Sequence, residues 1–289
     1  MALVVLIWGG NFAATKISLV SIPPLAFTAI RFATGSLLLW SLIGRLEPNR
    51  SLPPGLFWPI ALLGVVGNTL YQLCFITGLS RTSATNTALI LAAMPPVVTV
   101  TSGLLGLEAI TNRQRAALAL ATLGVLTVIA SRGLSLDQGD WRGDVLILAA
   151  VGCWTGYTLG LRRMANRMSP LRLTGWTMIT GTPALLLAGL PSLMTVHWAS
   201  VTWQAWTGLA YSTLLSLVAA YVLWSRAVLR LGASRAALYT CITPLIATLV
   251  AMALLAERPG IAHLIGGVLI VAGVLLGNAQ VFRLAPPEG

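Results

Sequence analysis

Long apolar runs recur along this chain, and each is close to the length of a helix that crosses a lipid bilayer. Such a helix needs about 20 mainly apolar residues. Hydropathy and helix-breaking residues predict ten of them, at about residues 2–20, 23–44, 57–79, 83–106, 112–131, 143–161, 170–190, 204–229, 234–256 and 260–282. Of 289 residues, 57% are hydrophobic and 9% are charged, whereas about 25% of a soluble domain is charged. We therefore predict an all-α integral membrane protein with ten transmembrane helices.

The connections between the runs are too short to hold a soluble domain, and two of them carry helix-start signals. Ser169 precedes Pro170, which places a capping hydroxyl before a proline at the first helical position. Thr111 and Gln114 have the spacing of a capping box. No basic segment precedes the first run, so we expect a retained helix rather than a cleaved signal peptide.

Basic residues are distributed unevenly between alternate connections. If the N-terminus is cytoplasmic, the inner connections and ends carry Arg45, Arg50, Arg113, Arg115, Arg162, Arg163, Arg167, Arg172, Arg226, Arg230, Arg235 and Arg283. The outer side carries only Lys16, Arg81, Arg132, Arg142 and Arg258. This asymmetry follows the positive-inside rule and places both termini in the cytoplasm. Membrane topology thus explains the net charge of +11, and we expect no binding to nucleic acid.

Residues that usually carry catalysis or metal binding are sparse. Cys74, Cys153 and Cys241 fall in three different predicted helices, and we interpret them as buried structural thiols. His197 and His263 are far apart in the sequence and close to helix ends. The sequence contains no nucleophile elbow, phosphate-binding loop or paired carboxylates. We therefore expect no enzyme activity, no catalytic residues, no metal and no cofactor.

The second half of the chain repeats the first. At an offset of 146 residues, the matches are Trp8 with Trp154, Gly10 with Gly156, Pro24 with Pro170, Thr28 with Thr174 and Gly35 with Gly181. At an offset of 149, they are Ala84 with Ala233, Pro95 with Pro244, Glu108 with Glu257 and Gly124 with Gly273. Matches of Trp, Pro, Glu and Gly in one order are difficult to attribute to shared apolar composition. We expect a first five-helix repeat at residues 1–139 and a second at 140–289.

The odd number of helices in each repeat inverts the second repeat in the membrane. Inverted repeats are typical of transporters, whose substrate site lies near the bilayer midplane where the halves meet. Pro95 and Pro96 lie within the fourth predicted helix, and Pro244 lies within the ninth. A proline inside a helix removes an amide donor and clashes with the preceding turn. These prolines are hinge candidates, and a packing kink is the alternative explanation for each.

Polar and aromatic side chains share one face of several predicted helices. Polar side chains in hydrocarbon must turn inward, so these residues are candidates for the wall of a central substrate cavity. The candidates are Trp8, Asn11 and Thr15 in the first helix, Asn68, Tyr71, Gln72 and Phe75 in the third, Trp154 and Tyr157 in the sixth, Trp176 in the seventh, Tyr221 and Trp224 in the eighth, and Tyr239 and Thr243 in the ninth. The alternative is that these groups join helices without contacting a ligand.

Two cations and a pair of glycines also fall within predicted helices. Lys16 is close to the outer end of the first helix, where its amine can reach the interface. Arg31 lies deeper, where it either bonds backbone carbonyls or helix ends, or attracts a carboxylate in the cavity. Gly273 and Gly277 favour close helix packing, inside the bundle or between two protomers. We expect a monomer or a weak homodimer.

The chain resembles the EamA-type ten-helix branch of the drug/metabolite transporter superfamily in the segments "WGGNFAATKISL", "PPLAFTAIRFATGSLLL", "LGLEAIT" and "LLAERPG". The resemblance covers nearly the whole chain and both repeats. It implies export of small metabolites from a bacterial cell through the inner (plasma) membrane. Within the family, the overall likeness and the aromatic interior point to exporters of aromatic amino acids and paraquat.

All seven acidic residues lie at or beyond the ends of the predicted helices. Small multidrug antiporters that resemble half of this architecture use a glutamate inside the membrane, where this chain offers Asn11. Without a membrane carboxylate for proton exchange, we expect facilitated or exchange export of amino acids, including aromatic ones, by alternating access through a cavity between the repeats. The alternative is a proton-coupled multidrug antiporter for cationic or amphipathic compounds. The expected partners are a small-molecule substrate and the lipid bilayer.

Overall fold

The computed structural model describes residues 1–81, 90–91, 93–130, 141–165, 167–243, 245–247, 249–250 and 261–278, and all regular structure in them is helical. The α-helices are α1 (Ala2–Leu19), α2 (Pro24–Leu46), α3 (Phe57–Gly64), α4 (Tyr71–Leu79), α6 (Met94–Leu104), α7 (Asn112–Ala130), α8 (Trp141–Arg163), α9 (Pro170–Thr195), α10 (Trp203–Tyr211), α11 (Ala220–Leu231), α12 (Ala233–Tyr239) and α14 (Ile261–Asn278). Two π-helical segments are η1 (Val65–Leu70) and η3 (Ser212–Ala219), and two short 3₁₀ segments are η2 (Trp198–Ser200) and η4 (Thr240–Ile242). The all-α prediction is confirmed.

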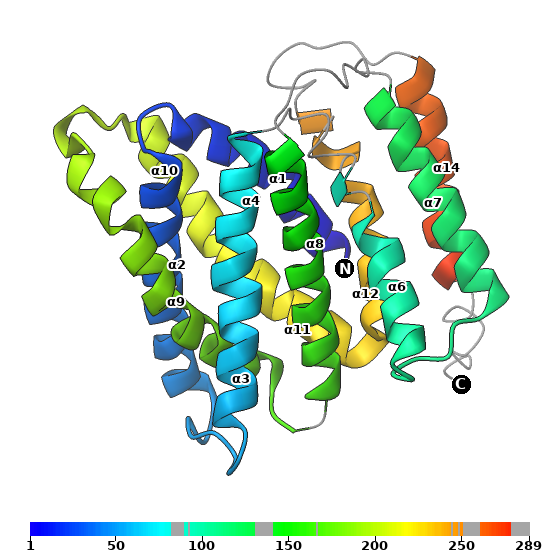
Figure 1. Cartoon of the computed structure of the whole chain (residues 1–289), viewed down its shortest axis with the longest axis horizontal. Helices are drawn as coiled ribbons and strands as arrows, with labels where there is room; N and C mark the ends of the chain where they lie inside the picture. Colours follow the sequence, from blue (N-terminus) through cyan, green and yellow to red (C-terminus); the bar gives the residue numbers. More distant parts are fainter. Residues whose placement is uncertain are drawn as a thin grey trace, which may run out of the picture.

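Six of the described helices are long and apolar enough to cross a membrane. They are α1, α2, the continuous helix α3–η1–α4, α8, α9 and the continuous helix α10–η3–α11. Many large apolar side chains are exposed on the outside of the bundle, among them Leu104, Leu187 and Val268 at 82%, 73% and 69%. Figure 1 shows the helices that carry them. A soluble protein rarely exposes so much apolar surface to water. The surface is that of a multi-pass membrane protein.

Both helix starts expected from local chemistry are confirmed. α9 begins at Pro170, and Ser169 Oγ accepts a hydrogen bond from the Arg172 amide at 3.2 Å. Before α7, the Thr111 amide donates to Gln114 Oε1 at 2.9 Å, and the Gln114 amide donates to Thr111 Oγ1 at 3.2 Å. This reciprocal pair satisfies amides that have no partner within the helix. Local sequence therefore decides where these two membrane helices begin.

The fourth predicted helix differs from the expectation in the position of its prolines. α6 begins at Met94, so Pro95 and Pro96 lie in its first turn rather than in the interior of a continuous helix. In the first turn, a missing amide hydrogen costs little because it would have no helical partner. The break in the helix thus comes immediately before the two prolines. Pro244 lies outside the described residues.

The third and eighth predicted helices correspond in shape as well as in sequence. Each contains a π-helical segment, and η1 and η3 end at Leu70 and Ala219, which are equivalent at the offset of 149 residues. In Figure 1, the α3–α4 helix rises from the lower end of the bundle and the α10–α11 helix descends from the upper end. Two equivalent helices that run in opposite directions are what an inverted repeat requires. π-helical turns are rare in proteins, but those that do occur are often at functional sites.

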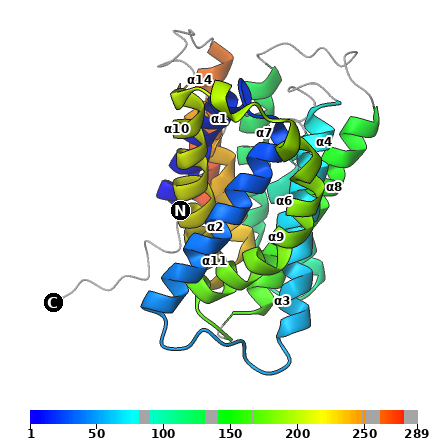
Figure 2. The same cartoon turned by 90° about the vertical axis from the view of Figure 1, so that its left-hand side faces the viewer.

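Equivalent helices of the two halves also touch each other. α2 packs against α9, and the two helices lie side by side in Figures 1 and 2. Ser36 Oγ and Thr182 Oγ1, which are equivalent at the offset of 146 residues, are hydrogen-bonded at 2.7 Å. In an arrangement with two-fold pseudosymmetry, a residue can touch its own equivalent only close to the axis. This hydrogen bond therefore lies close to the pseudo-two-fold axis.

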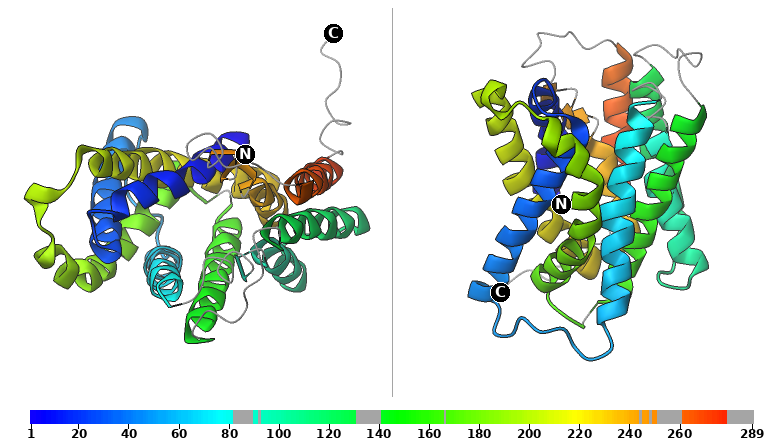
Figure 3. Two further views of the ribbon diagram at one scale, coloured as in Figure 1. Left: turned by 90° about the horizontal axis from the view of Figure 1, so that it is seen from above. Right: turned by 60° about the vertical axis from the view of Figure 1, so that its left-hand side comes forward.

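Glycines bring a second equivalent pair, α7 and α14, into close contact at one side of the bundle (Figure 3). A Cβ atom on Gly124 would lie 2.6 Å from the Gly266 oxygen, and a Cβ atom on Gly273 would lie 2.7 Å from the Ala117 oxygen. At the offset of 149 residues, Gly124 corresponds to Gly273 and Ala117 corresponds to Gly266, so the two contacts are equivalent. A Cβ atom on Gly277 would also meet Ala117. The glycine face of α14 is thus used inside the bundle rather than between protomers.

We expect Gly273→Ala to destabilise the protein, because its methyl group would overlap backbone atoms of α7. Overpacking of this kind costs about 1–3 kcal/mol. Gly152→Ala is the matched control, since this helical glycine is exposed and has no atom within 4 Å of a new Cβ. Thermal unfolding in detergent should show a lower midpoint for Gly273→Ala alone. Equal midpoints for the two variants would contradict close packing of α7 on α14.

Candidate functional site

Aromatic rings from four helices meet at the centre of the bundle. The rings are Trp8 of α1, Tyr71 of α4, Trp154 and Tyr157 of α8, and Tyr221 and Trp224 of α11, which we call the aromatic cluster. Trp154 is its central member, with ring centroids 5.8 Å from Trp8, 5.1 Å from Tyr71, 5.5 Å from Tyr157, 5.7 Å from Tyr221 and 5.7 Å from Trp224. All six rings are among the residues predicted to line a central site.

The aromatic cluster lies where the two halves of the chain meet. Trp8 and Trp154 are equivalent at the offset of 146 residues, and their rings touch edge to face. Like Ser36 and Thr182, they must lie close to the pseudo-two-fold axis. A site on this axis has contacts with both halves, so it can respond to movement of one half against the other.

Three hydrogen bonds join α1 to the second half of the chain, and two of them are made at Ile7 and Trp8. The Trp8 indole donates from Nε1 to the Ser216 carbonyl in η3 at 3.2 Å. The Tyr211 hydroxyl donates to the Ile7 carbonyl at 3.1 Å. A π-helical turn changes which carbonyl groups are bonded within the helix. The segment η3 thereby contributes a backbone acceptor that holds one ring of the aromatic cluster.

Polar groups without a partner accompany the rings. Asn11 Oδ1 and Thr15 Oγ1 on α1 and Trp224 Nε1 on α11 are buried, and they have no hydrogen-bond partner among the described residues. Gln72 is 7% exposed, directly after Tyr71 on α4. Buried polar groups are normally hydrogen-bonded, so each unpartnered group requires an explanation. Aromatic surface combined with such groups suits a small molecule with a ring and polar atoms.

Several predicted site residues lie away from the rings or make bonds between helices. Asn68 Nδ2 donates to the Thr177 carbonyl of α9 at 2.9 Å. Trp176 Nε1 donates to the Arg50 carbonyl at 2.9 Å, close to one end of the bundle. Tyr239 packs against the separate apolar cluster between α7 and α14. Phe75 extends the aromatic cluster, since its ring lies 6.1 Å from Tyr71. Thr243 Oγ1 is buried and has no hydrogen-bond partner within the described part of the chain.

The two cations in the predicted helices have different surroundings. Lys16 is exposed in the last turn of α1, as expected for a side chain that reaches the interface. Arg31 of α2 is only 8% exposed. Its Nη1 donates to Ser212 Oγ at 2.9 Å. Ser212 directly follows α10, so within the described residues Arg31 bonds a side chain at a helix end rather than a backbone carbonyl.

The basic ends of the helices gather at one end of the bundle. Arg45 lies in the last turn of α2, Arg162 and Arg163 in that of α8, and Arg230 in that of α11. Figure 1 shows these three helix ends, together with the start of α7, at the lower end of the molecule. The charge asymmetry expected from the sequence is thus an asymmetry between the two ends of the fold.

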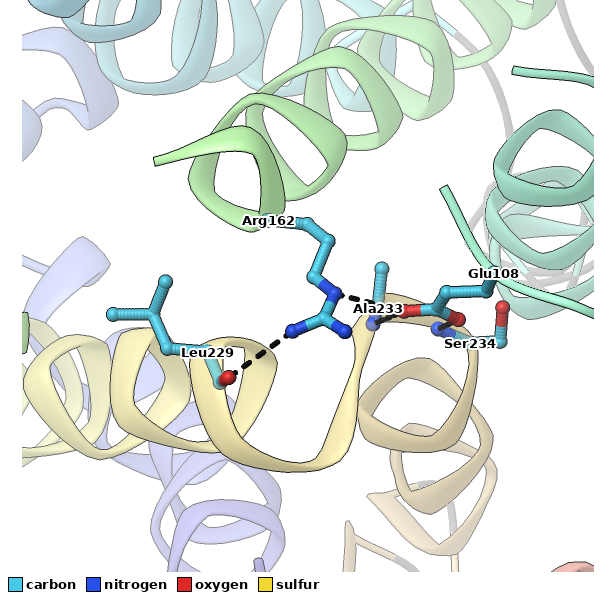
Figure 4. A network of polar contacts seen from close by, with 5 residues as sticks. All are labelled: Glu108, Arg162, Leu229, Ala233 and Ser234. Carbon is cyan, nitrogen blue, oxygen red and sulfur yellow. Dashed lines mark hydrogen bonds and ion pairs between the residues drawn. The ribbon is translucent and has the colours of Figure 1, made fainter. Parts of the chain in front are cut away.

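A polar network at this basic end joins the two halves (Figure 4). Glu108, after α6, accepts hydrogen bonds from the amides of Ala233 and Ser234, the second at 3.0 Å. Arg162 at the end of α8 lies 3.5 Å from Glu108 through its Nε and donates from Nη1 to the Leu229 carbonyl at 3.1 Å. An ion pair between Glu108 and an arginine at a helix end agrees with the expectation from the sequence. The amide partners are more than 100 residues away along the chain, so no local pattern indicates them.

The geometry of this network depends on one glycine. Gly232 joins α11 to α12 with a φ of +95°, a conformation that other residues rarely adopt. The turn brings the first amides of α12 to the Glu108 carboxylate. Carboxylates are favourable beside helix amides, and bonds to a charged acceptor are stronger than neutral ones. Glu108 is therefore held by helix amides as well as by Arg162.

We expect Glu108→Gln to lower the thermal unfolding midpoint more than Arg162→Gln, because it weakens two amide bonds as well as the ion pair. In a double-mutant cycle the two changes should be coupled by about 0.5–3 kcal/mol. Arg163→Gln is the control, since Arg163 is the exposed neighbour of Arg162. An Arg162→Gln midpoint as low as that of Glu108→Gln would show that the amides contribute little.

The described residues contain no group of three His, Cys, Asp or Glu side chains placed to hold a metal ion. Cys241 is buried, as predicted. Cys74 and Cys153 are only partly buried, so the interpretation as buried thiols does not hold for them. Both lie on the α4–α8 contact, where a thiol fills space between two helices without complete enclosure.

Comparison with known proteins is consistent with this geometry. The model of the EamA-like transporter family matches residues 1–130 and 141–278. An uncharacterized transporter of Archaeoglobus fulgidus is 30% identical over 288 residues, covering 97% of this chain and 96% of that protein. A probable terminal-alkyne amino-acid exporter of Streptantibioticus cattleyicolor is 29% identical, covering 97% and 92%. A probable amino-acid metabolite efflux pump of Salmonella typhimurium is 26% identical, covering 98% and 94%. One crystal structure superposes with a TM-score of 0.82 at 18% identity, covering 97% and 96% of the two chains.

Proposed function

Because the chain belongs to the EamA-like transporter family, we propose that it exports amino acids, including aromatic ones, through the site at the aromatic cluster. The observation that carries this proposal is the contact between the equivalent residues Trp8 and Trp154. It places six aromatic rings at the meeting of the two halves, where inverted-repeat transporters bind their substrates. Transport moves an unchanged molecule, and the proposal includes no catalytic step.

The chemistry of the site indicates which class of substrate it can bind. Aromatic faces pack against flat rings and attract cations such as an ammonium group. Buried amide and indole groups, among them Asn11 Oδ1 and Trp224 Nε1, can bond to the polar atoms of an amino acid. Two relatives that cover nearly the whole chain are described as a probable amino-acid exporter and a probable amino-acid metabolite efflux pump. Amino acids satisfy all three features.

The polar network at the basic end supports alternating access as the mechanism. Glu108 belongs to the first half of the chain, whereas Arg162, Ala233 and Ser234 belong to the second. We infer that opening of this end breaks these bonds as one half moves against the other. By the positive-inside rule, this end is cytoplasmic, and both termini face the cytoplasm. We place the protein in the inner membrane of a bacterium. We propose facilitated or exchange transport, since the described acids lie outside the helices (Glu47 and Glu108) or in the first turn of α8 (Asp144), and none lies in the middle of a membrane helix.

Uptake into proteoliposomes tests the proposed substrate. We expect labelled tryptophan to enter without an imposed pH gradient, and Tyr71→Ala and Gln72→Ala to reduce that flux roughly tenfold, the effect of losing about 1.4 kcal/mol of binding. Trp58→Ala is the control, because Trp58 of α3 is 78% exposed on the outside of the bundle. Flux of an organic cation driven by a pH gradient, with no tryptophan flux, would instead identify a proton-coupled multidrug antiporter.

The hinge role of the prolines has a separate test. Pro95→Ala should slow tryptophan flux and leave the thermal unfolding midpoint nearly unchanged, because a first-turn proline contributes little to hydrogen bonding. Alanine would allow helix α6 to extend toward Ile90 and would stiffen the break before Met94. The control is Pro191→Ala at an exposed position of α9. Unchanged flux in Pro95→Ala would remove this proline from the mechanism.

A further inference from the structure

Arg31 is a buried cation inside a membrane-spanning helix. It lies in α2, well away from both helix ends, and is 8% exposed. A charged side chain inside a membrane helix is costly and therefore rare. Such residues pair with opposite charges or face a site where they have a function. The structure must therefore supply a reason for a cation at this position.

The contacts of Arg31 within the described residues are all with uncharged groups. Its hydrogen bond from Nη1 goes to the neutral Ser212 hydroxyl. Its guanidinium carbon lies 5.6 Å from the centroids of both the Phe27 and Phe32 rings. Its Nε is buried and has no hydrogen-bond partner there, and no described carboxylate forms an ion pair with it. The positive charge is thus held in place but not neutralised by the part of the chain that is described.

Arg31 also borders the aromatic cluster. Phe32 belongs to the same buried apolar core as Trp154 and Tyr221. Helix α2, which carries Arg31, packs against η3 and touches α4, the helix that carries Tyr71. Ser212, its hydrogen-bond partner, begins η3, the segment that also bonds the Trp8 indole. A cation, a π-helical segment and the rings therefore meet on the same side of the proposed site.

We propose that Arg31 binds the carboxylate group of the transported substrate while the substrate side chain lies against the aromatic cluster. A guanidinium group offers five donors in a planar fork that matches a carboxylate, and Ser212 uses only one of them. This inference rests on the proposed function and narrows it. The protein would select molecules that carry a carboxylate and an aromatic or apolar group, and it would reject the corresponding amides and amines.

The test compares substrates that differ only at the carboxylate. Proteoliposomes containing the full chain are supplied with labelled tryptophan, tryptophanamide or tryptamine at one concentration. The wild-type protein should transport tryptophan at least about tenfold faster than the other two, since bonds to a charged partner are worth about 1.5–3 kcal/mol. Arg31→Gln should reduce this preference to near unity, and Arg31→Lys should keep part of it. Arg45→Gln, on the exposed end of the same helix, should leave the preference unchanged.

Each outcome of the comparison decides a different claim. If wild-type protein transports tryptophanamide as fast as tryptophan, the inference is overturned even when Arg31→Gln fails to fold. If Arg31→Gln slows all three compounds equally and preserves their ratio, Arg31 is structural and the inference is also overturned. If tryptophan is not transported at all, the proposed function fails and the inference fails with it. Size-exclusion profiles of the variants establish that each flux value comes from folded protein.

Discussion

The hydrocarbon core of a bilayer offers no hydrogen-bond partners, and the interior of this bundle is arranged around that constraint. Helices satisfy their own backbone groups, so the remaining polar atoms are those of side chains. Asn68 and Thr69 turn inward and bond carbonyl groups of α9, and Ser36 bonds Thr182. The apolar side chains are left to cover the outside. Hydrogen bonds between helices therefore determine how the two halves are joined.

Close helix contact is the second requirement, and small residues provide it. Gly181 lies so close to Gly64 that a Cβ atom would overlap its carbonyl, and Gly124 and Gly273 do the same for α7 and α14. The two α7–α14 contacts are equivalent under the repeat, and so are the π-helical segments η1 and η3. The two repeats pack in a similar way and run in opposite directions, so large aromatic side chains from both meet at the centre. The aromatic cluster is a consequence of this arrangement.

Charges follow the same division between interior and ends. Glu108 and Arg162 lie at one end of the bundle, where water and helix amides stabilise them. Arg31 is the exception among the described cations of the helix interiors, and it lies beside the rings rather than away from them. The position of a charge therefore distinguishes two roles in this molecule. Charges at the end join the halves, and the buried cation is the group proposed to bind the substrate.

The sequence by itself determined the helical class, the starts of α7 and α9 and the faces on which Trp8, Tyr71 and Tyr221 lie. These properties depend on composition, on caps a few residues apart and on the helical period, all of which are local. It also indicated the repeat, whose equivalent residues Trp8 and Trp154 are in contact.

Only the tertiary structure decided that Trp154 is central, that Trp176 bonds near the basic end and that Glu108 caps α12. It also revealed the π-helical segments η1 and η3 and the neutral surroundings of Arg31. Each of these depends on how far a helix is rotated about its own axis and on which distant segment it meets. Helical periodicity defines the face of a residue but not its partner, because partners more than 100 residues apart are chosen by packing of the whole bundle.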